Sequence, residues 1–77
     1  MTRYFFDIRD GDELAPDEEG MILPDVMAAQ EEAARALADM ARDMIRGQPF
    51  RHMAIEVRNH DGPVLEASFL WRVQRKQ

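Results

Sequence analysis

Residues 25–47 have the sequence DVMAAQEEAARALADMARDMIRG, and this stretch decides the fold. At 100° per residue, its apolar side chains fall in one stripe and its charged side chains on the opposite side. The stripe consists of Val26, Ala29, Ala33, Leu37, Met40, Ala41 and Met44. Asp25 is a good N-cap, because its carboxylate can accept from the free N–H groups of the first turn. Gly47 can take the left-handed conformation that ends a helix, and Pro49 prevents its resumption. The pattern predicts one amphipathic helix over about 26–46.

Three further segments alternate apolar and polar side chains with the period of two that is typical of β-strands. The first covers residues 3–9 and places Tyr4, Phe6 and Ile8 on one face. The other two, 53–58 and 64–73, flank the turn Asn59-His60-Asp61-Gly62, which predicts an antiparallel hairpin. The segment 64–73 has the bulkiest apolar face, which favours a position inside the sheet.

The segment between the first strand and the helix begins with the turn Asp10-Gly11-Asp12-Glu13. Pro16 excludes a central strand in the residues that follow. We expect a loop that ends in a brief edge strand at Met21-Ile22-Leu23.

One apolar stripe on a helix and one apolar face on a sheet predict a two-layer α+β sandwich. We expect a single domain over 1–77, with the helix of about 26–46 on a mainly antiparallel sheet of three to four strands. The element order is β(β)αββ, in which the bracketed strand is the short edge strand. The first strand could pair antiparallel with the last strand or parallel with the one before it. We favour the former, which makes the strand 64–73 central.

The composition excludes several classes of protein. The 77 residues carry 15 acidic and 10 basic side chains, a net charge of −5, and no cysteine. Without cysteine there is neither a disulfide framework nor a thiolate zinc site. The pattern of a secretion signal is missing and no apolar stretch approaches the length of a membrane span. We therefore expect a cytoplasmic protein with no membrane partner.

The acidic, histidine and serine residues do not have the spacing of known catalytic or metal-binding motifs. The acidic segment 10–20 does not place ligands as an EF-hand requires. His52 and His60 have no partner at metal-ligand spacing. The only serine, Ser68, lies in the middle of a predicted strand, so no nucleophile is placed to act with His60 and Asp61. We therefore predict a non-enzymatic protein without a metal, a cofactor or a small-molecule substrate.

The residues instead favour an interaction surface. Phe5 and Leu70 lie on the sheet face opposite the predicted core, where they could meet if both strands are central. With Arg3 and Arg72 beside them, they form the predicted surface for a second copy or a protein partner. Our leading hypothesis is a non-catalytic protein-interaction or homodimerising module.

Two alternatives remain open. Residues 1–34 carry a net charge of −8 and residues 35–77 a net charge of +3. The first alternative is therefore a weak nucleic-acid-binding or regulatory protein, although the acidic total argues against nucleic acid as a partner. Its basic residues would be Arg58, Arg72, Arg75 and Lys76. The second is a ligand-binding or enzymatic role of the acidic segment with His60, which requires a pocket beside those residues.

The opening residues RYFFDIRDG (3–11), the segment PDEEG (16–20) and the residues LPD (23–25) before an Ala/Glu-rich helix carry a resemblance. Together with MAIEV (53–57) and Asp61-Gly62, they are similar to a family of short, uncharacterised alphaproteobacterial proteins. That family is classed as a domain of unknown function. The resemblance spans almost the whole chain and implies no activity, substrate or catalytic residue.

Overall fold

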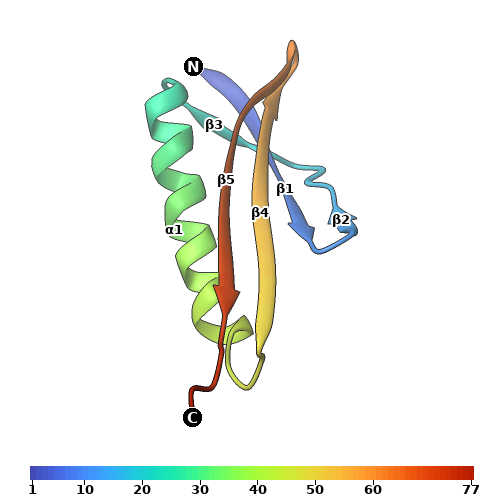
Figure 1. Ribbon diagram of the computed structural model, residues 1–77. Helices are drawn as coiled ribbons and strands as arrows, with labels where there is room; N and C mark the ends of the chain where they lie inside the picture. The colour runs from blue at the N-terminus through green and yellow to red at the C-terminus, as the bar shows by residue number, and fades with distance from the viewer.

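The computed structural model describes all 77 residues and contains one helix and five strands. Their order along the chain is β1 (Thr2–Asp10), β2 (Glu13–Ala15), β3 (Met21–Leu23), α1 (Val26–Met44), β4 (Phe50–Asn59) and β5 (Gly62–Arg72). The helix covers one face of an antiparallel sheet (Figure 1), so the predicted α+β sandwich and its element order are confirmed. The sheet has one strand more than predicted, because residues 13–15 also pair with β1.

Local signals form the helix as predicted. The Asp25 carboxylate accepts from the Ala28 N–H at 2.9 Å, and Gly47 has a φ of +75° just beyond the helix. The helix ends at Met44, two residues earlier than predicted, and the Ile45 N–H donates to the Ala41 carbonyl. The middle of the apolar stripe is buried, at Ala29, Ala33 and Leu37, whereas its two ends, Val26 and Met44, are exposed.

The strand order differs from both arrangements considered from the sequence. The sheet has the order β2-β1-β4-β5, and β1 pairs antiparallel with β4. Strand β4 is therefore central and β5 lies at an edge, so the prediction of a central strand 64–73 is wrong. The reason lies in β4, where the consecutive residues Met53, Ala54 and Ile55 are all at least 97% buried. Ala54 points to the face without a helix, where residues of the two flanking strands, Arg9 and Ser68, lie opposite it.

The second edge of β1 is covered by β2 and β3 together. Ala15 lies opposite Ile8 and Met21 lies opposite Tyr4, so the two short strands run along β1 one after the other. Between them, residues 16–20 face only residues 5–7 of β1 and form a protruding loop. The predicted edge strand at 21–23 is confirmed.

The core lies between α1 and the sheet. Its buried members are Tyr4, Ala29, Ala33, Leu37, Met53, Ile55 and Val57, and Phe6, Ile8, Leu65 and Phe69 pack against them. Trp71 is half-buried outside this cluster, and its indole N–H donates to the Gln48 carbonyl at 2.8 Å. Leu70 is 56% exposed, so the predicted faces of β5 are correct even though its place in the sheet was not.

The β4–β5 hairpin contains one irregularity. Gly62 has a φ of +122° at the turn, as expected for this position. Arg58 lies opposite Pro63 but Val57 lies opposite Leu65, so Val64 is an additional residue that forms a β-bulge. Both Val64 and Leu65 pack against the core.

Candidate functional site

The four residues of the predicted interaction surface do not form one patch. Phe5 lies opposite Arg58, near one end of β4, whereas Leu70 lies opposite His52, near the other end. Strand β4 separates their strands, and the two positions are about 20 Å apart along it. The prediction that Phe5 and Leu70 meet is therefore wrong, because it depended on the incorrect strand order.

Phe5 and Arg3 belong to a cluster around the loop 16–20. The Arg58 guanidinium lies 4.5 Å from the centre of the Phe5 ring, and the His60 ring packs against the same phenyl group in a T-shaped arrangement. Arg3 donates to the Glu19 carbonyl at 2.7 Å. The Arg3 hydrogen bond joins the loop to β1, and the other two contacts pack against the Phe5 side chain, which is half-buried.

Two aspartates and an arginine fix this loop. The Asp17 carboxylate accepts from the Phe6 N–H at 3.1 Å, while the Asp17 N–H donates to the Asp7 carboxylate at 2.8 Å. Arg58 donates to Asp7 at 2.8 Å and to the Asp17 carbonyl at 3.0 Å. This Asp7–Asp17–Arg58 cluster replaces the backbone pairing that β1 lacks at the loop.

The second oxygen of Asp17 completes the loop. It accepts from the Glu19 N–H at 3.1 Å and from the Gly20 N–H at 3.2 Å. Aspartate is well suited to this position, because a short carboxylate can accept from N–H groups two and three residues onward. The PDEEG segment therefore has a local structural role.

The cluster lowers the pKa of both aspartates. Burial by itself would raise the pKa of Asp7, but hydrogen bonds from Arg58 and from the Asp17 N–H outweigh burial and leave that pKa below its usual value. Burial would also raise the pKa of Asp17. That pKa is nevertheless lowered, because the N–H groups of Phe6, Gly20 and Glu19 donate to its carboxylate. Both groups are thus held in the charged form.

The lowered pKa values of Asp7 and Asp17 predict a fold that loses stability in acid. Because both pKa values are lower in the folded state, the stabilisation is fully present above the unfolded pKa of about 4. It is lost as the pH falls through the folded values. Urea unfolding between pH 6 and pH 2 should show a free energy of unfolding that decreases below about pH 5. Asp7→Asn should make this slope shallower and Glu18→Gln should leave it unchanged; equal slopes in all three proteins would contradict the assignment.

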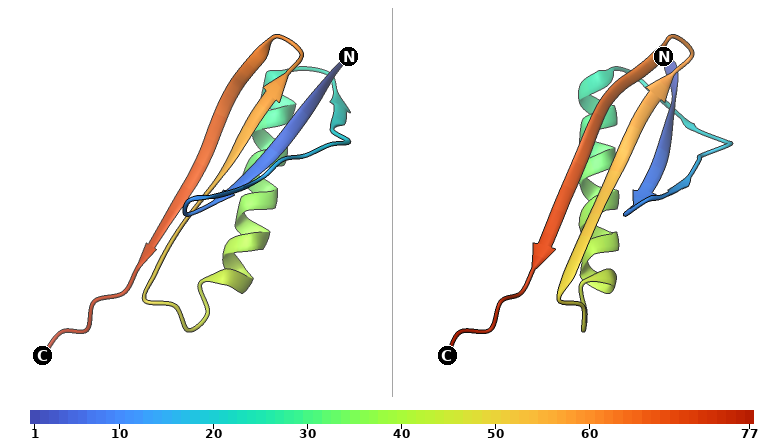
Figure 2. Two further views of the ribbon diagram at one scale, coloured as in Figure 1. Left: turned by 90° about the vertical axis from the view of Figure 1, so that its right-hand side faces the viewer. Right: turned by 45° about the vertical axis from the view of Figure 1, so that its right-hand side comes forward.

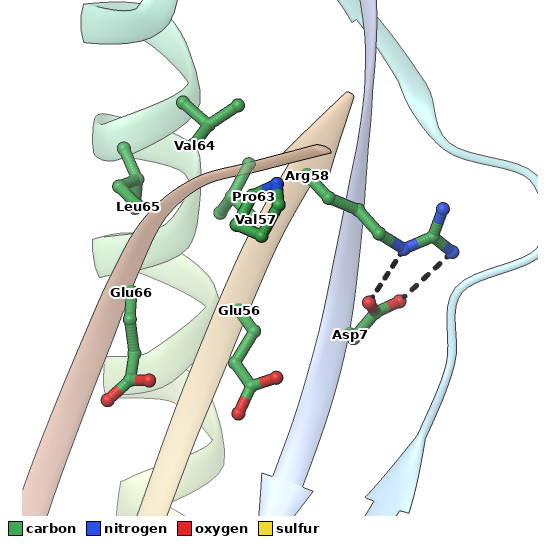
Figure 3. Close-up of a pocket in the computed structure, with 8 residues that line it drawn as sticks. All are labelled: Asp7, Glu56, Val57, Arg58, Pro63, Val64, Leu65 and Glu66. Atoms are coloured by element: carbon green, nitrogen blue, oxygen red, sulfur yellow. Dashed lines mark hydrogen bonds and ion pairs between the residues drawn. The ribbon is translucent and has the colours of Figure 1, made fainter. Parts of the chain in front are cut away.

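A depression of about 360 Å³ lies beside this cluster, at the β-bulge between β4 and β5 (Figure 3). Asp7, Glu56 and Glu66 form one row across β1, β4 and β5, and the last two point in the same direction. Asp7 is bound by Arg58, and Glu56 accepts from Arg9 at 2.6 Å. Glu66, on the edge strand, is exposed and makes no ion pair.

The acidic segment and His60 do not share a pocket. Asp10 and Glu13 line a depression at the end of β1 that is distant in register from the hairpin, and His60 lines none. No single depression joins the two, and a ligand-binding or enzymatic role stays a prediction from the sequence.

The basic residues of the other alternative are also dispersed. Arg58 is engaged by Asp7, whereas Arg72 is exposed at the far end of β5. Arg75 and Lys76 lie on the terminal segment that extends away from the sheet (Figure 2). Nucleic-acid binding stays a prediction from the sequence.

The free edge of β5 is the most distinctive surface. β5 pairs with β4 only, and the Val73 N–H donates back to the Pro49 carbonyl at 2.8 Å, on the β4 side. Backbone groups alternate in direction along a strand, and the register with β4 is regular from Leu65 onward. The N–H and C=O groups of Glu66, Ser68, Leu70 and Arg72 therefore point away from β4. We call these four residues the β5 edge.

An apolar depression of about 430 Å³ runs beside the β5 edge. It is lined by Ala34, Leu37, Ala38 and Ala41 of α1 and by Ala67, Ser68 and Phe69 of β5. Ala34 and Ala38 are exposed. The side of α1 next to the β5 edge therefore presents mainly small alanine side chains.

The fold and these surfaces define a small α+β domain in which the outer edge of β5 has no neighbouring strand. A family model described as Domain of unknown function (DUF6894) matches residues 3–70, and the chain belongs to this family. No curated protein and no solved structure matched the chain. The single helix, α1, is not apolar and long enough to cross a membrane.

Proposed function

We propose that this chain is a non-catalytic protein-interaction module of the bacterial cytoplasm that binds an extended strand along the β5 edge. The observation that carries the proposal is that the backbone N–H and C=O groups of four alternate residues point outward from the edge of β5 that has no neighbouring strand. Such an edge is a template for another strand. The exposed side chain of Leu70 lies within it and offers an apolar contact.

Further features support this reading. Asp7 and Glu56, two carboxylates that line the depression at the β-bulge, form ion pairs with Arg58 and Arg9 and serve the loop and the sheet. The cysteine-free composition suits a reducing compartment. Leu70 and Arg72, two of the four residues predicted from the sequence, lie on the β5 edge.

A displayed library of random nine-residue peptides tests the proposal. Wild-type protein should enrich peptides with alternating apolar residues, which pair as strands. Ser68→Pro should lose this binding, because proline removes an outward N–H without removing a bond to β4. Ser68→Ala keeps the N–H and is the matched control, and circular dichroism verifies that both variants fold. Enriched peptides that bind Ser68→Pro as well as wild type would overturn the proposal.

A further inference from the structure

We propose that the strand bound at the β5 edge is β5 of a second copy, antiparallel around a twofold axis at Phe69. This inference rests on the proposed function and identifies its partner. The resulting dimer would have one continuous sheet with both helices on the same face.

Backbone geometry limits the registers that two β5 strands can adopt. Only residues with outward N–H and C=O groups can form hydrogen-bonded pairs, so members of the β5 edge must face one another. With the axis at Phe69, Glu66 faces Arg72 and Ser68 faces Leu70, each pair occurring twice. These pairs provide on the order of eight backbone hydrogen bonds. A shift of the register by two residues places Glu66 opposite either Leu70 or Gln74.

Charge selects among these registers. Glu66 lies opposite Glu56 within its own chain, an unfavourable cross-strand pair. It makes no ion pair, because Arg9, the cation whose charge acts on it, is bound by Glu56. Arg72 is exposed and likewise makes no ion pair. The axis at Phe69 joins these two unpartnered charges twice across the interface, and neither shifted register does so.

The helices fit the same axis. A twofold axis perpendicular to the sheet keeps both copies of α1 on one face, and α1 contacts both β4 and β5. The two helix axes are then about two strand spacings apart, roughly 10 Å, which is close to the usual helix–helix distance. The residues available for that contact are the small Ala34, Ala38 and Ala41, and their depression reaches Phe69 itself.

The hairpin end of β5 sets one limit of the pairing. Pro63 has no N–H to donate, and the bulge at Val64 interrupts the regular alternation of the strand. In the proposed register both residues lie beyond the last pair, Glu66 with Arg72. The irregular part of β5 therefore lies outside the proposed strand pairing and does not disrupt its hydrogen bonds.

Single-cysteine variants of the full chain test the register, since the protein has no cysteine of its own. Facing residues in hydrogen-bonded pairs have Cα atoms about 5.5 Å apart, within the range of a disulfide. An oxidised equimolar mixture of Ser68→Cys and Leu70→Cys should form the mixed disulfide dimer. Each variant alone should remain largely uncrosslinked. Preferential crosslinking of either variant with itself would place the axis elsewhere and overturn the proposed register.

Charge reversal tests the interface by sedimentation equilibrium over a concentration series. Arg72→Glu should weaken the dimer about tenfold or more, because two attractions become two repulsions. The double variant Glu66→Arg/Arg72→Glu should restore dimerisation to near the wild-type value. Arg75→Glu, which has the same charge change outside β5, is the control and should have little effect.

The outcomes separate this inference from the proposed function. A wild-type protein that stays monomeric and a cysteine mixture that does not crosslink would overturn self-pairing. If library peptides still bind the wild type and not Ser68→Pro, the β5 edge remains an interaction site for a different strand. If Ser68→Pro has no effect on either peptides or dimer, both proposals fail.

Discussion

Replacing Asp7 with alanine is expected to lower the free energy of unfolding by about 2–3 kcal/mol, as breaking charged, partly buried hydrogen bonds does. The variant leaves Arg58 without its carboxylate and the Asp17 N–H without its acceptor. The Arg58 side chain is 40% exposed and can regain water, which keeps the loss below that of a fully buried pair. For a chain of this length, with a total stability of about 4–12 kcal/mol, the loss is large.

Urea unfolding at pH 7 measures this loss. Glu18→Ala removes the same charge from the same loop, where Glu18 is exposed, and should change the free energy of unfolding by about 0.5 kcal/mol or less. A double-mutant cycle with Arg58→Met, which keeps an apolar stem over Phe5, should give a favourable coupling between Asp7 and Arg58. Additive effects of the two substitutions would contradict the interaction.

Gly20→Ala is expected to cost about 2–3 kcal/mol, from left-handed backbone strain together with steric overlap. Gly20 has a φ of +74°, and a Cβ atom there would lie 2.9 Å from the Tyr4 carbonyl oxygen and 3.0 Å from Phe5 Cδ1. The loop would have to move away from β1, and the hydrogen bond from the Gly20 N–H to Asp17 would be strained as well.

Gly11→Ala is the matched control for this prediction. Gly11 also has a positive φ, +61°, but nothing lies within 4 Å of the position of an added Cβ. Its replacement should cost only the backbone term, about 1 kcal/mol. Thermal or urea unfolding of both variants measures the difference in the free energy of unfolding. Equal losses of stability would show that the close approach of the loop to β1 adds nothing to the cost of Gly20→Ala.

Elements encoded by neighbouring residues were predictable from the sequence. The helix has its N-cap at Asp25 and its positive-φ glycine at Gly47, and the hairpin has Gly62. Each signal acts within a few residues, so no knowledge of the tertiary structure was needed. The assignment of apolar faces succeeded for the same reason, because side chains alternate along a strand whatever its neighbours are.

The strand order required information of a different kind. The bulk of Phe69 and Trp71 suggested a central strand, but both are only half-buried at an edge. The better signal was the unbroken apolar run Met53-Ala54-Ile55 in β4, against the polar Glu66 and Ser68 that alternate along β5. A strand flanked by neighbours on both edges can bury consecutive apolar residues, whereas bulky side chains on one face do not determine the position of a strand in the sheet.

The candidate site was predictable only in part for the same reason. Leu70 and Arg72 were identified as surface residues, but the importance of Glu66 follows from its position on a free edge. The Asp7–Asp17–Arg58 cluster joins residues up to 51 positions apart, and no local pattern connects them. Long-range pairing of charges depends on register, which single-sequence periodicity does not determine.

The late pairing of β1 has a consequence during synthesis. The central neighbour of β1 in the sheet is β4, whose residues 53–58 are translated only after the whole of α1. Until then β2 and β3 are the only strands that can pair with β1, and they occupy one of its two edges. Strand β1 thus keeps one unsatisfied edge until β4 is available, and only this long-range pairing completes the sheet.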